Sequence, residues 1–158
     1  SAYATYAYTK AELTSDAPFL FNADGTDGAA DGDRLPGSPE HQFSLGINYQ
    51  TDVFNDKTLD INYGLTAQSD VISKVGLRDS GEVLPGYSLS NISAKLTADA
   101  WSTTLYVDNM FNKYAVTSVR RSDADITSAN GAEIQRNYGH YINRPLTVGI
   151  KFNYKFEI

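Results

Sequence analysis

Near the end of the chain, apolar and polar residues alternate strictly in the stretch Thr147-Val148-Gly149-Ile150-Lys151-Phe152-Asn153-Tyr154-Lys155-Phe156. Successive side chains of a β-strand point to opposite faces, so this order predicts a strand with one apolar and one polar side. The apolar side becomes aromatic toward its end, as expected of a strand whose outer side meets lipid and whose last rings lie at the membrane interface. A strand of a soluble β-sandwich alternates as well, but the position at the chain end and the aromatic spacing favour the membrane interpretation.

Similar patterns predict about six strands and no helix, each near the roughly 9–11 residues or more that a tilted membrane strand needs. The predicted strands are Tyr3–Leu13, His41–Val53, Lys57–Ser69, Tyr87–Ala98, Trp101–Tyr114 and Tyr141–Phe156. In the fourth strand the apolar residues change from one set of alternate positions to the other, which suggests a bulge near Ser90 and Asn91. In the first strand two sets of residues compete for the outward face, Ala4, Tyr6 and Tyr8 against Tyr3, Thr5 and Ala7.

The connections between these strands alternate in length. The long ones are Thr14–Glu40, Asp70–Gly86 and Arg120–His140, and the short ones are Phe54-Asn55-Asp56 and Asp99-Ala100. Outer-membrane barrels have long extracellular loops and short periplasmic turns along an up-and-down meander. The sequence therefore predicts an all-β, antiparallel up-and-down meander whose C-terminus lies on the periplasmic side.

The composition excludes several classes of protein. Among the 158 residues there is no Cys, so disulfides and thiolate metal sites are excluded. No window approaches 18 consecutive apolar residues, which excludes a transmembrane helix. The formal net charge of −6 argues against a nucleic-acid partner, because no basic stripe exists to neutralise phosphates. The eleven Tyr suit an interface girdle or a polar lumen, and a Tyr-rich β-sandwich lectin is the alternative.

The first residues, Ser1 to Tyr8, have no basic head, apolar centre or cleavage site, so they are not expected to form a signal peptide. They already look like a strand. We therefore expect residues 1–158 to be one portion of a longer protein.

Two groups of residues resemble known families. The pattern Thr147, Gly149, Phe152 and Tyr154 resembles the C-terminal assembly signal by which bacterial outer-membrane β-barrels are recognised for insertion. The second group consists of the segments Leu84-Pro85-Gly86-Tyr87-Ser88-Leu89-Ser90-Asn91, Leu105-Tyr106-Val107-Asp108-Asn109-Met110-Phe111-Asn112-Lys113-Tyr114 and Arg144-Pro145-Leu146-Thr147-Val148-Gly149, together with Trp101 and the Leu35–His41 turn. These residues resemble the C-terminal barrel segment of TonB-dependent outer-membrane receptors.

The resemblance implies a specific architecture and function. The family's barrel has about 22 strands around a plugged lumen, so this chain would supply roughly the last six. An active importer of a scarce ligand is implied, most readily a ferric siderophore, with haem, cobalamin and oligosaccharides as other possibilities. The implied partners are outer-membrane lipid and lipopolysaccharide, the protein's own plug domain and remaining strands, and TonB through the missing N-terminal part. A passive porin-type barrel and a soluble β-sandwich binding module are the alternatives.

The last long connection carries the candidate ligand-binding residues. These are Arg120, Arg121, Arg136, Tyr138 and His140. Arginine binds carboxylates and phosphates bidentately, and aromatic rings stack on planar or sugar ligands. Such a set would suit an anionic iron–siderophore complex. Contact with lipopolysaccharide phosphates, or simple charge balance with Asp123 and Asp125, would explain the same arginines.

The sequence offers little for catalysis. It has no G-x-S-x-G elbow, H-E-x-x-H motif, P-loop or nucleophilic Cys, so no enzyme activity and no cofactor are predicted. The Asp-rich segment from Asp24 to Asp33 could gather oxygen ligands for Ca²⁺, but the position of the bidentate EF-hand Glu is occupied by Leu35. Gly and Asp are also ordinary loop formers, so no metal site is predicted.

Overall fold

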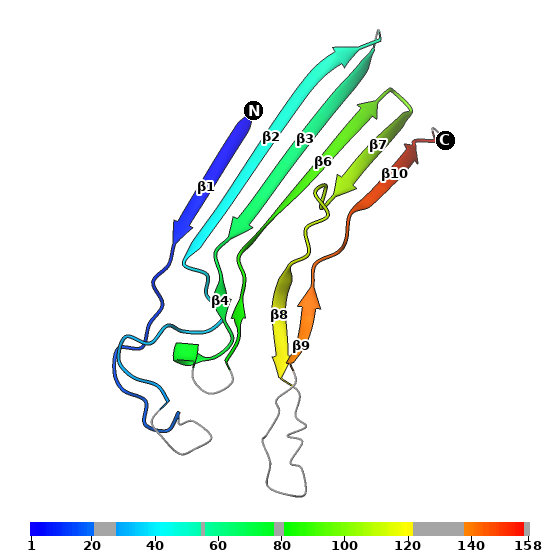
Figure 1. Ribbon diagram of the computed structural model, residues 1–158. Coiled ribbons are helices and arrows are strands. Elements are labelled where there is room, and N and C mark those ends of the chain that lie inside the picture. The colour runs from blue at the N-terminus through cyan, green and yellow to red at the C-terminus, as the bar shows by residue number, and fades with distance from the viewer. Residues whose placement is uncertain (21–27, 55, 78–80, 122–137, 157–158) are drawn as a thin grey trace, which may run out of the picture.

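The computed structural model describes residues 1–20, 28–54, 56–77, 81–121 and 138–156. Their main feature is one antiparallel six-stranded sheet in the order β1-β2-β3-β6-β7-β10 (Figure 1). Its strands are β1 (Ala2–Tyr8), β2 (His41–Val53), β3 (Lys57–Gln68), β6 (Tyr87–Thr97), β7 (Trp101–Asp108) and β10 (Thr147–Tyr154). Each strand pairs with the next one along the meander, so the predicted all-β up-and-down fold is confirmed.

Two small sheets lie in the connections. One pairs β4 (Val71–Ile72) with β5 (Val83–Leu84), and the other pairs β8 (Val116–Arg121) with β9 (Tyr138–Ile142). The described residues also contain a single turn of 3-10 helix, η1 (Val75–Leu77). No helix in the described ranges has the length and apolar character needed to cross a membrane.

The third and fourth predicted strands were one residue too long, and three others differ more from the structure. The first ends at Tyr8, where the chain diverges from β2 after a last hydrogen bond from Thr9 N to Glu40 O of 2.9 Å. The fifth ends at Asp108, because Asn109 takes a left-handed conformation with φ 50°. The sixth is divided into β9 and β10 around Pro145, which has no N–H to donate to a ladder.

The bulge predicted near Ser90 and Asn91 is wrong. Pairing between β3 and β6 runs without a shift from Thr58 opposite Thr97 to Gln68 opposite Tyr87. The alternation of apolar residues in β6 is irregular because Ser88 and Ser90 lie on the mainly apolar face. There the Tyr63 hydroxyl donates a hydrogen bond of 3.2 Å to Ser90 Oγ, which satisfies one of these hydroxyl groups.

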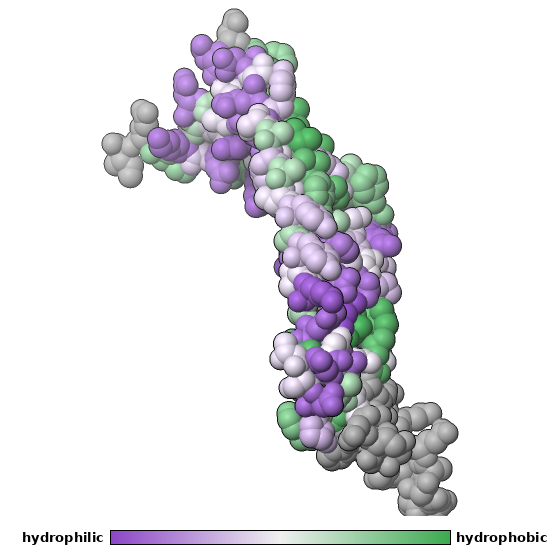
Figure 2. Space-filling model, turned by 90° about the vertical axis from the view of Figure 1, so that its left-hand side faces the viewer, coloured by the Kyte–Doolittle hydropathy of each residue, from purple (hydrophilic) through white to green (hydrophobic). Residues whose placement is uncertain are grey.

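The register divides the side chains into an apolar face and a polar face. Ile150 lies opposite Leu105, which lies opposite Ala94, and the same row continues to Ile61 and Tyr49. In β1, Ala4 pairs with Leu45, so Ala4, Tyr6 and Tyr8 take the apolar face. Seen from the side of β1, hydrophobic residues gather along one side of the sheet (Figure 2). This face is open, and Ile150 is 66% exposed.

The connections also separate into two ends. The short turns after β2 and β6 lie at the end of the sheet that carries both chain termini, and the three long connections lie at the opposite end (Figure 1). The short turn after β2 contains two non-glycine residues with positive φ, Phe54 at 49° and Asp56 at 75°. The predicted alternation of long and short connections is therefore confirmed.

Candidate ligand site at the long connections

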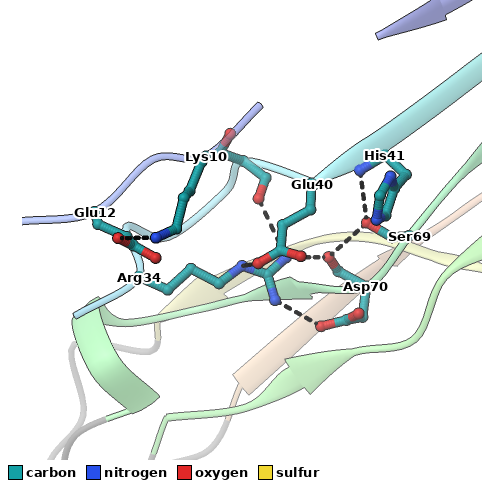
Figure 3. A network of polar contacts seen from close by, with 8 residues as sticks. Lys10, Glu12, Arg34, Glu40, His41, Ser69 and Asp70 are labelled. Atoms are coloured by element: carbon teal, nitrogen blue, oxygen red, sulfur yellow. Dashed lines mark hydrogen bonds and ion pairs between the residues drawn. The ribbon is translucent and has the colours of Figure 1, made fainter. Parts of the chain in front are cut away.

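Arg34 joins the first two long connections. Its guanidinium donates hydrogen bonds to the Asp70 carboxylate at 2.8 Å, the Asp70 carbonyl at 2.5 Å and the Ser38 carbonyl at 3.3 Å (Figure 3). The Glu40 carboxylate lies 3.8 Å from Nε, which has no hydrogen-bond partner. The side chain is only 22% exposed, so these bonds replace most of the water that an arginine would otherwise hold.

Backbone contacts complete this junction. Gly37 N donates to Ile72 O at 3.0 Å, and Gly76 N donates to Arg34 O at 3.0 Å. Gly76 has φ 57°, and a Cβ there would lie 2.6 Å from the Asp33 carboxyl group, so a larger residue would be strained and would displace the Asp33 side chain. The connections that follow β1 and β3 are therefore folded against each other as one unit.

The long connections contain buried apolar side chains. Val71, Ile72 and Leu84 are each at most 6% exposed, and Ala17, Ala29 and Ala115 are similarly buried. By contrast, most side chains of the six-stranded sheet are partly or fully exposed. Among the described residues, these six buried apolar residues all lie in the long connections.

A cavity of about 420 Å³ opens where the three long connections meet the polar face of the sheet. Its lining combines prolines, amides, hydroxyls and aliphatic side chains, namely Pro36, Gly37, Pro39, Gln42, Gln68, Val71, Ile72, Ser73, Leu84, Thr117, Ser118 and Val119. The volume is in the range of small-molecule sites. These residues offer hydrogen-bonding groups beside an apolar wall.

The predicted ligand residues are only partly brought together. Arg120 and His140 both lie on the β8–β9 hairpin, where Arg120 pairs with Gly139 and His140 pairs with Val119. Neighbouring positions of a strand face opposite sides, so the Arg120 and His140 side chains do not share a face. Arg121 pairs with Tyr138 at the end of the hairpin, and Arg136 lies outside the described residues.

His140 contacts a carboxylate that the sequence did not indicate. Its Nε2 lies 2.7 Å from Glu82 Oε2, and Glu82 N donates to Ser73 Oγ at 2.7 Å. Both side chains are partly exposed, at 42% for His140 and 35% for Glu82. His140 therefore connects the hairpin to the second long connection, and its ring is engaged within the protein.

Comparison with known proteins decides the family. The model of the family described as "TonB dependent receptor-like, beta-barrel" matches residues 1–110. The chain belongs to this family. No curated protein and no solved structure matches the chain.

Members of this family carry out active transport across the bacterial outer membrane. Because the chain belongs to the family, we assign it to that membrane. In barrels of this kind the apolar face meets lipid and the polar face lines the lumen, so we call the two faces of the sheet the lipid face and the lumen face. The match ends at Met110, and β10 continues the same sheet by pairing with β7 from Thr147 opposite Asp108 to Tyr154 opposite Trp101.

The motif Val107–Tyr114 of the receptor barrel contains a buried structural residue. Asn109 is 5% exposed and its side chain forms three hydrogen bonds. Its amide nitrogen donates to Lys113 O at 3.0 Å and to Arg144 O at 2.9 Å, and its Oδ1 accepts from Lys113 N at 2.8 Å. Asn109 therefore turns the chain out of β7 and holds it beside the segment that leads into β10.

Two further asparagines extend this junction. Asn143 Oδ1 accepts from Ala115 N at 2.8 Å, and its amide nitrogen donates to Lys113 O at 2.8 Å. Asn112 Oδ1 accepts from Leu146 N at 3.0 Å. These bonds fix the base of the β8–β9 hairpin, so the motif that carries the family resemblance has a structural role here.

The four residues of the predicted assembly signal lie on β10, the last strand of the sheet. Thr147 and Gly149 belong to the lumen face, while Phe152 and Tyr154 belong to the lipid face. A Cβ at Gly149 would collide with the Tyr106 ring on β7, so this glycine makes room for a cross-strand ring. The Phe152 ring stacks on Trp101 with centroids 6.3 Å apart. Recognition of these residues during assembly stays a prediction.

Several residues that shape the site have no periodic signal in the sequence. Arg34, Glu82 and Asn143 are polar residues in loops, and each has one partner that lies 28 to 58 positions away. The Asp-rich segment is only partly described. There Asp33 accepts a hydrogen bond from Ala30 N at 2.7 Å and Asp16 accepts one from Asp31 N at 2.9 Å, which is ordinary loop stabilisation.

Proposed function

We propose that this chain forms the C-terminal part of the barrel wall of an active importer, and that its long connections take part in capturing the ligand. The family match carries the proposal. In this proposal residues 1–158 belong to a single barrel domain, the plug domain and the remaining strands lie elsewhere in the whole protein, and no part of this chain is catalytic.

The orientation follows from the connections. Both chain termini and both short turns lie at one end of the sheet, and we assign this end to the periplasm. The cavity between the long connections then faces the outside of the cell, where a ligand would first meet the receptor. Lipid and lipopolysaccharide would contact the apolar face and its outer rim.

The ligand that we propose is a ferric siderophore. The support is the three arginines of the last long connection, where Arg120 and Arg121 lie at the end of β8 and Arg136 follows in sequence. Guanidinium groups donate several hydrogen bonds to oxygen-rich ligands. TonB would supply the energy through the N-terminal part of the whole protein.

Energy dependence tests the proposed function. In cells that express the full-length receptor, uptake of radiolabelled ferric siderophore should stop when the proton gradient is collapsed or TonB is deleted, whereas surface binding should persist. A passive porin-type barrel would continue to transport under both conditions, and this result would overturn active import.

Replacing Arg120, Arg121 and Arg136 with Ala tests the loop. Ligand binding to the full receptor should weaken by about 1–3 kcal/mol, roughly ten- to a hundredfold, because one or two charge-assisted contacts are lost. Lys in place of Arg should restore only part of the affinity, since an ammonium lacks the bidentate fork. Lys57→Ala with Lys155→Ala, at the opposite end of the sheet, is the control. Unchanged affinity with greater sensitivity to detergent would assign the arginines to lipopolysaccharide.

A further inference from the structure

Three hollows follow one another along the lumen face. The first is the cavity between the long connections, about 420 Å³ in volume. The second, about 270 Å³, lies beside Ser44, Thr66, Tyr87 and Leu89. The third, about 320 Å³, lies between the Tyr3 and Tyr106 side chains, above Gly46 and Gly64.

These hollows are neighbours along β2 and β3. The first and second share Gln42 and Gln68, which are paired across β2 and β3. The second is lined by Ser44 and Thr66, and the third by Gly46 and Gly64, which are the next residues of the same two strands on the same face. We call the path formed by the three hollows the lumen track.

The lumen track is almost free of charge. Among the residues that line the three hollows, Asp108 is the one charged side chain. The other charged residues that the register places on the lumen side of the sheet are gathered nearer the short turns, namely Asp52, Asp60, Lys95 and Lys151. The charges on this wall therefore lie mostly beyond the track, toward the proposed periplasmic end.

The lining is rich in neutral hydrogen-bonding groups. Asn48 and Asn62 point onto the lumen face from β2 and β3, and Asn48 Nδ2 donates to Asn62 Oδ1 at 2.8 Å. Gly46 lies opposite Gly64, and Gly46 is covered by the Tyr3 ring, so the floor of the third hollow is bare backbone only at Gly64. A Cβ at Gly64 would meet no atom within 4 Å, which shows that this floor is open.

We propose that the lumen track guides a net-neutral cargo rich in amides and hydroxyls. A charged complex that entered these hollows would lose hydration without gaining a counter-charge, whereas amide and hydroxyl groups would find partners there. The inference rests on the proposed function and narrows it. Three hydroxamate groups, each with one negative charge, neutralise Fe³⁺, whereas three catecholates leave a charge of −3, so the track favours a ferric trihydroxamate.

A comparison of two iron complexes tests the inference on the wild-type, full-length receptor. At limiting concentration in energised cells, uptake of a ferric trihydroxamate should exceed uptake of a ferric tris-catecholate roughly tenfold, equivalent to about 1.4 kcal/mol. Equal uptake of the two complexes, or faster uptake of the tris-catecholate, would overturn the proposal that the lumen track prefers neutral cargo. Siderophore import itself would still stand. Uptake of neither complex would overturn both.

Filling the third hollow tests the path itself. Gly64→Tyr should lower uptake of the ferric trihydroxamate about five- to tenfold while its binding to the cell surface stays unchanged, because the ring obstructs a step after capture. Thr104→Tyr, on the same face but outside the lining of the three hollows, is the matched control and should transport normally. Wild-type uptake by Gly64→Tyr would overturn the path. So would increased passive passage of small antibiotics, because it would indicate that the hollow seats the plug.

Discussion

Asn109 determines the path of the chain after β7. Its φ of 50° lies in the left-handed region, which asparagine tolerates better than most residues, and its buried amide satisfies groups on two segments. One of these segments follows directly in sequence, and the other leads into β10. A single side chain therefore couples the exit from one barrel strand to the start of the next.

Replacing Asn109 should destabilise the full receptor. Asn109→Ala removes the amide partners of Lys113 and Arg144 and places a less tolerant residue at positive φ, so we expect a loss of about 2–4 kcal/mol. Asn109→Gly removes the same hydrogen bonds but accepts the φ, and should cost about 1 kcal/mol less. Urea unfolding in detergent micelles measures both values. Equal stability of Asn109→Ala and wild type would contradict this role.

Two glycines on the lumen face lie under tyrosine rings of the neighbouring strand. Gly46 lies opposite Tyr3, and Gly149 lies opposite Tyr106. A Cβ at either glycine would collide with the ring above it. Lys151 Nζ lies 5.4 Å from the centroid of the same Tyr106 ring, which adds a cation–π contact from β10.

Gly149→Ala should therefore displace the Tyr106 ring and cost about 1–3 kcal/mol of barrel stability, as overpacking does. Gly64→Ala is the matched control, because a Cβ there meets open space, and it should change stability by less than about 0.5 kcal/mol. The temperature at which the folded, heat-modifiable band is lost on gels measures the difference. Identical behaviour of the two variants would show that the Tyr106 ring moves aside without loss of barrel stability.

At the residue scale, the sequence could predict which residues alternate but not which ones meet. The glycine of the assembly pattern was recognisable from its spacing, yet the ring that lies over it comes from another strand. Similarly, His140 was predicted from the chemistry of its loop, while its partner Glu82 is 58 positions away. Contacts of this kind depend on register and loop folding, which a single sequence does not encode locally.

The long connections behave as an element of their own. Arg34 holds the first against the second, and backbone hydrogen bonds at Gly37 and Gly76 reinforce this contact. At the edge of the same network (Figure 3) the Glu12 carboxylate accepts a hydrogen bond from Lys10 at 2.9 Å and raises the pKa of that amine above its ordinary value. Lys10 is exposed, so this pair contributes little to stability.

Arg34→Lys should loosen these connections without melting the barrel. One ammonium cannot donate simultaneously to the Asp70 carboxylate, the Asp70 carbonyl and the Ser38 carbonyl, and we expect a local loss of about 1–3 kcal/mol. Hydrogen exchange at the Gly37 and Gly76 amides should accelerate, while exchange within β2 and β3 stays slow. Lys10→Ala is the control. Unchanged exchange at Gly37 would contradict the role given to Arg34.

At the element scale, the strands of the wall could be predicted because each has a period of two and an apolar face. The bounds of β2 were predicted correctly, and the pattern for β3 extended one residue too far. The small strands β4, β5 and β8 were missed, since they are short and their segments are rich in turn-forming or charged residues, and the end of β9 was joined to β10 in one predicted strand. Their pairing is stabilised by the tertiary contacts of the loops.

The sheet as a whole requires two different solvents. Its lipid face carries exposed residues such as Val148, Ile150 and Phe152, each at least 64% exposed, while the lumen face opposite them is polar. In water this apolar face would aggregate, and in lipid the free edges of β1 and β10 would leave backbone groups unpaired. A stable sheet of this kind therefore needs both a membrane and strands that pair with its two edges.

A charge placed on each face tests this assignment. Ile150→Arg in the full receptor should cost about 2–4 kcal/mol if the residue lies near the bilayer midplane, whereas Asn153→Arg, on the lumen face of the same strand, should be tolerated better. The yield of heat-modifiable barrel in outer-membrane fractions is the measurement. Equal losses for both variants would refute the assigned faces.

The meander has one further consequence, which concerns how such walls change in evolution. Neighbouring strands of the six-stranded sheet are antiparallel and follow one another along the chain, so two consecutive strands with their short turn form a repeatable unit. Duplicating or deleting β2 and β3 as a pair would preserve which face is polar and which end carries the long connections. A gene for this wall can therefore alter the circumference of its pore in steps of one hairpin, while each outer loop diverges independently of the strands that hold it.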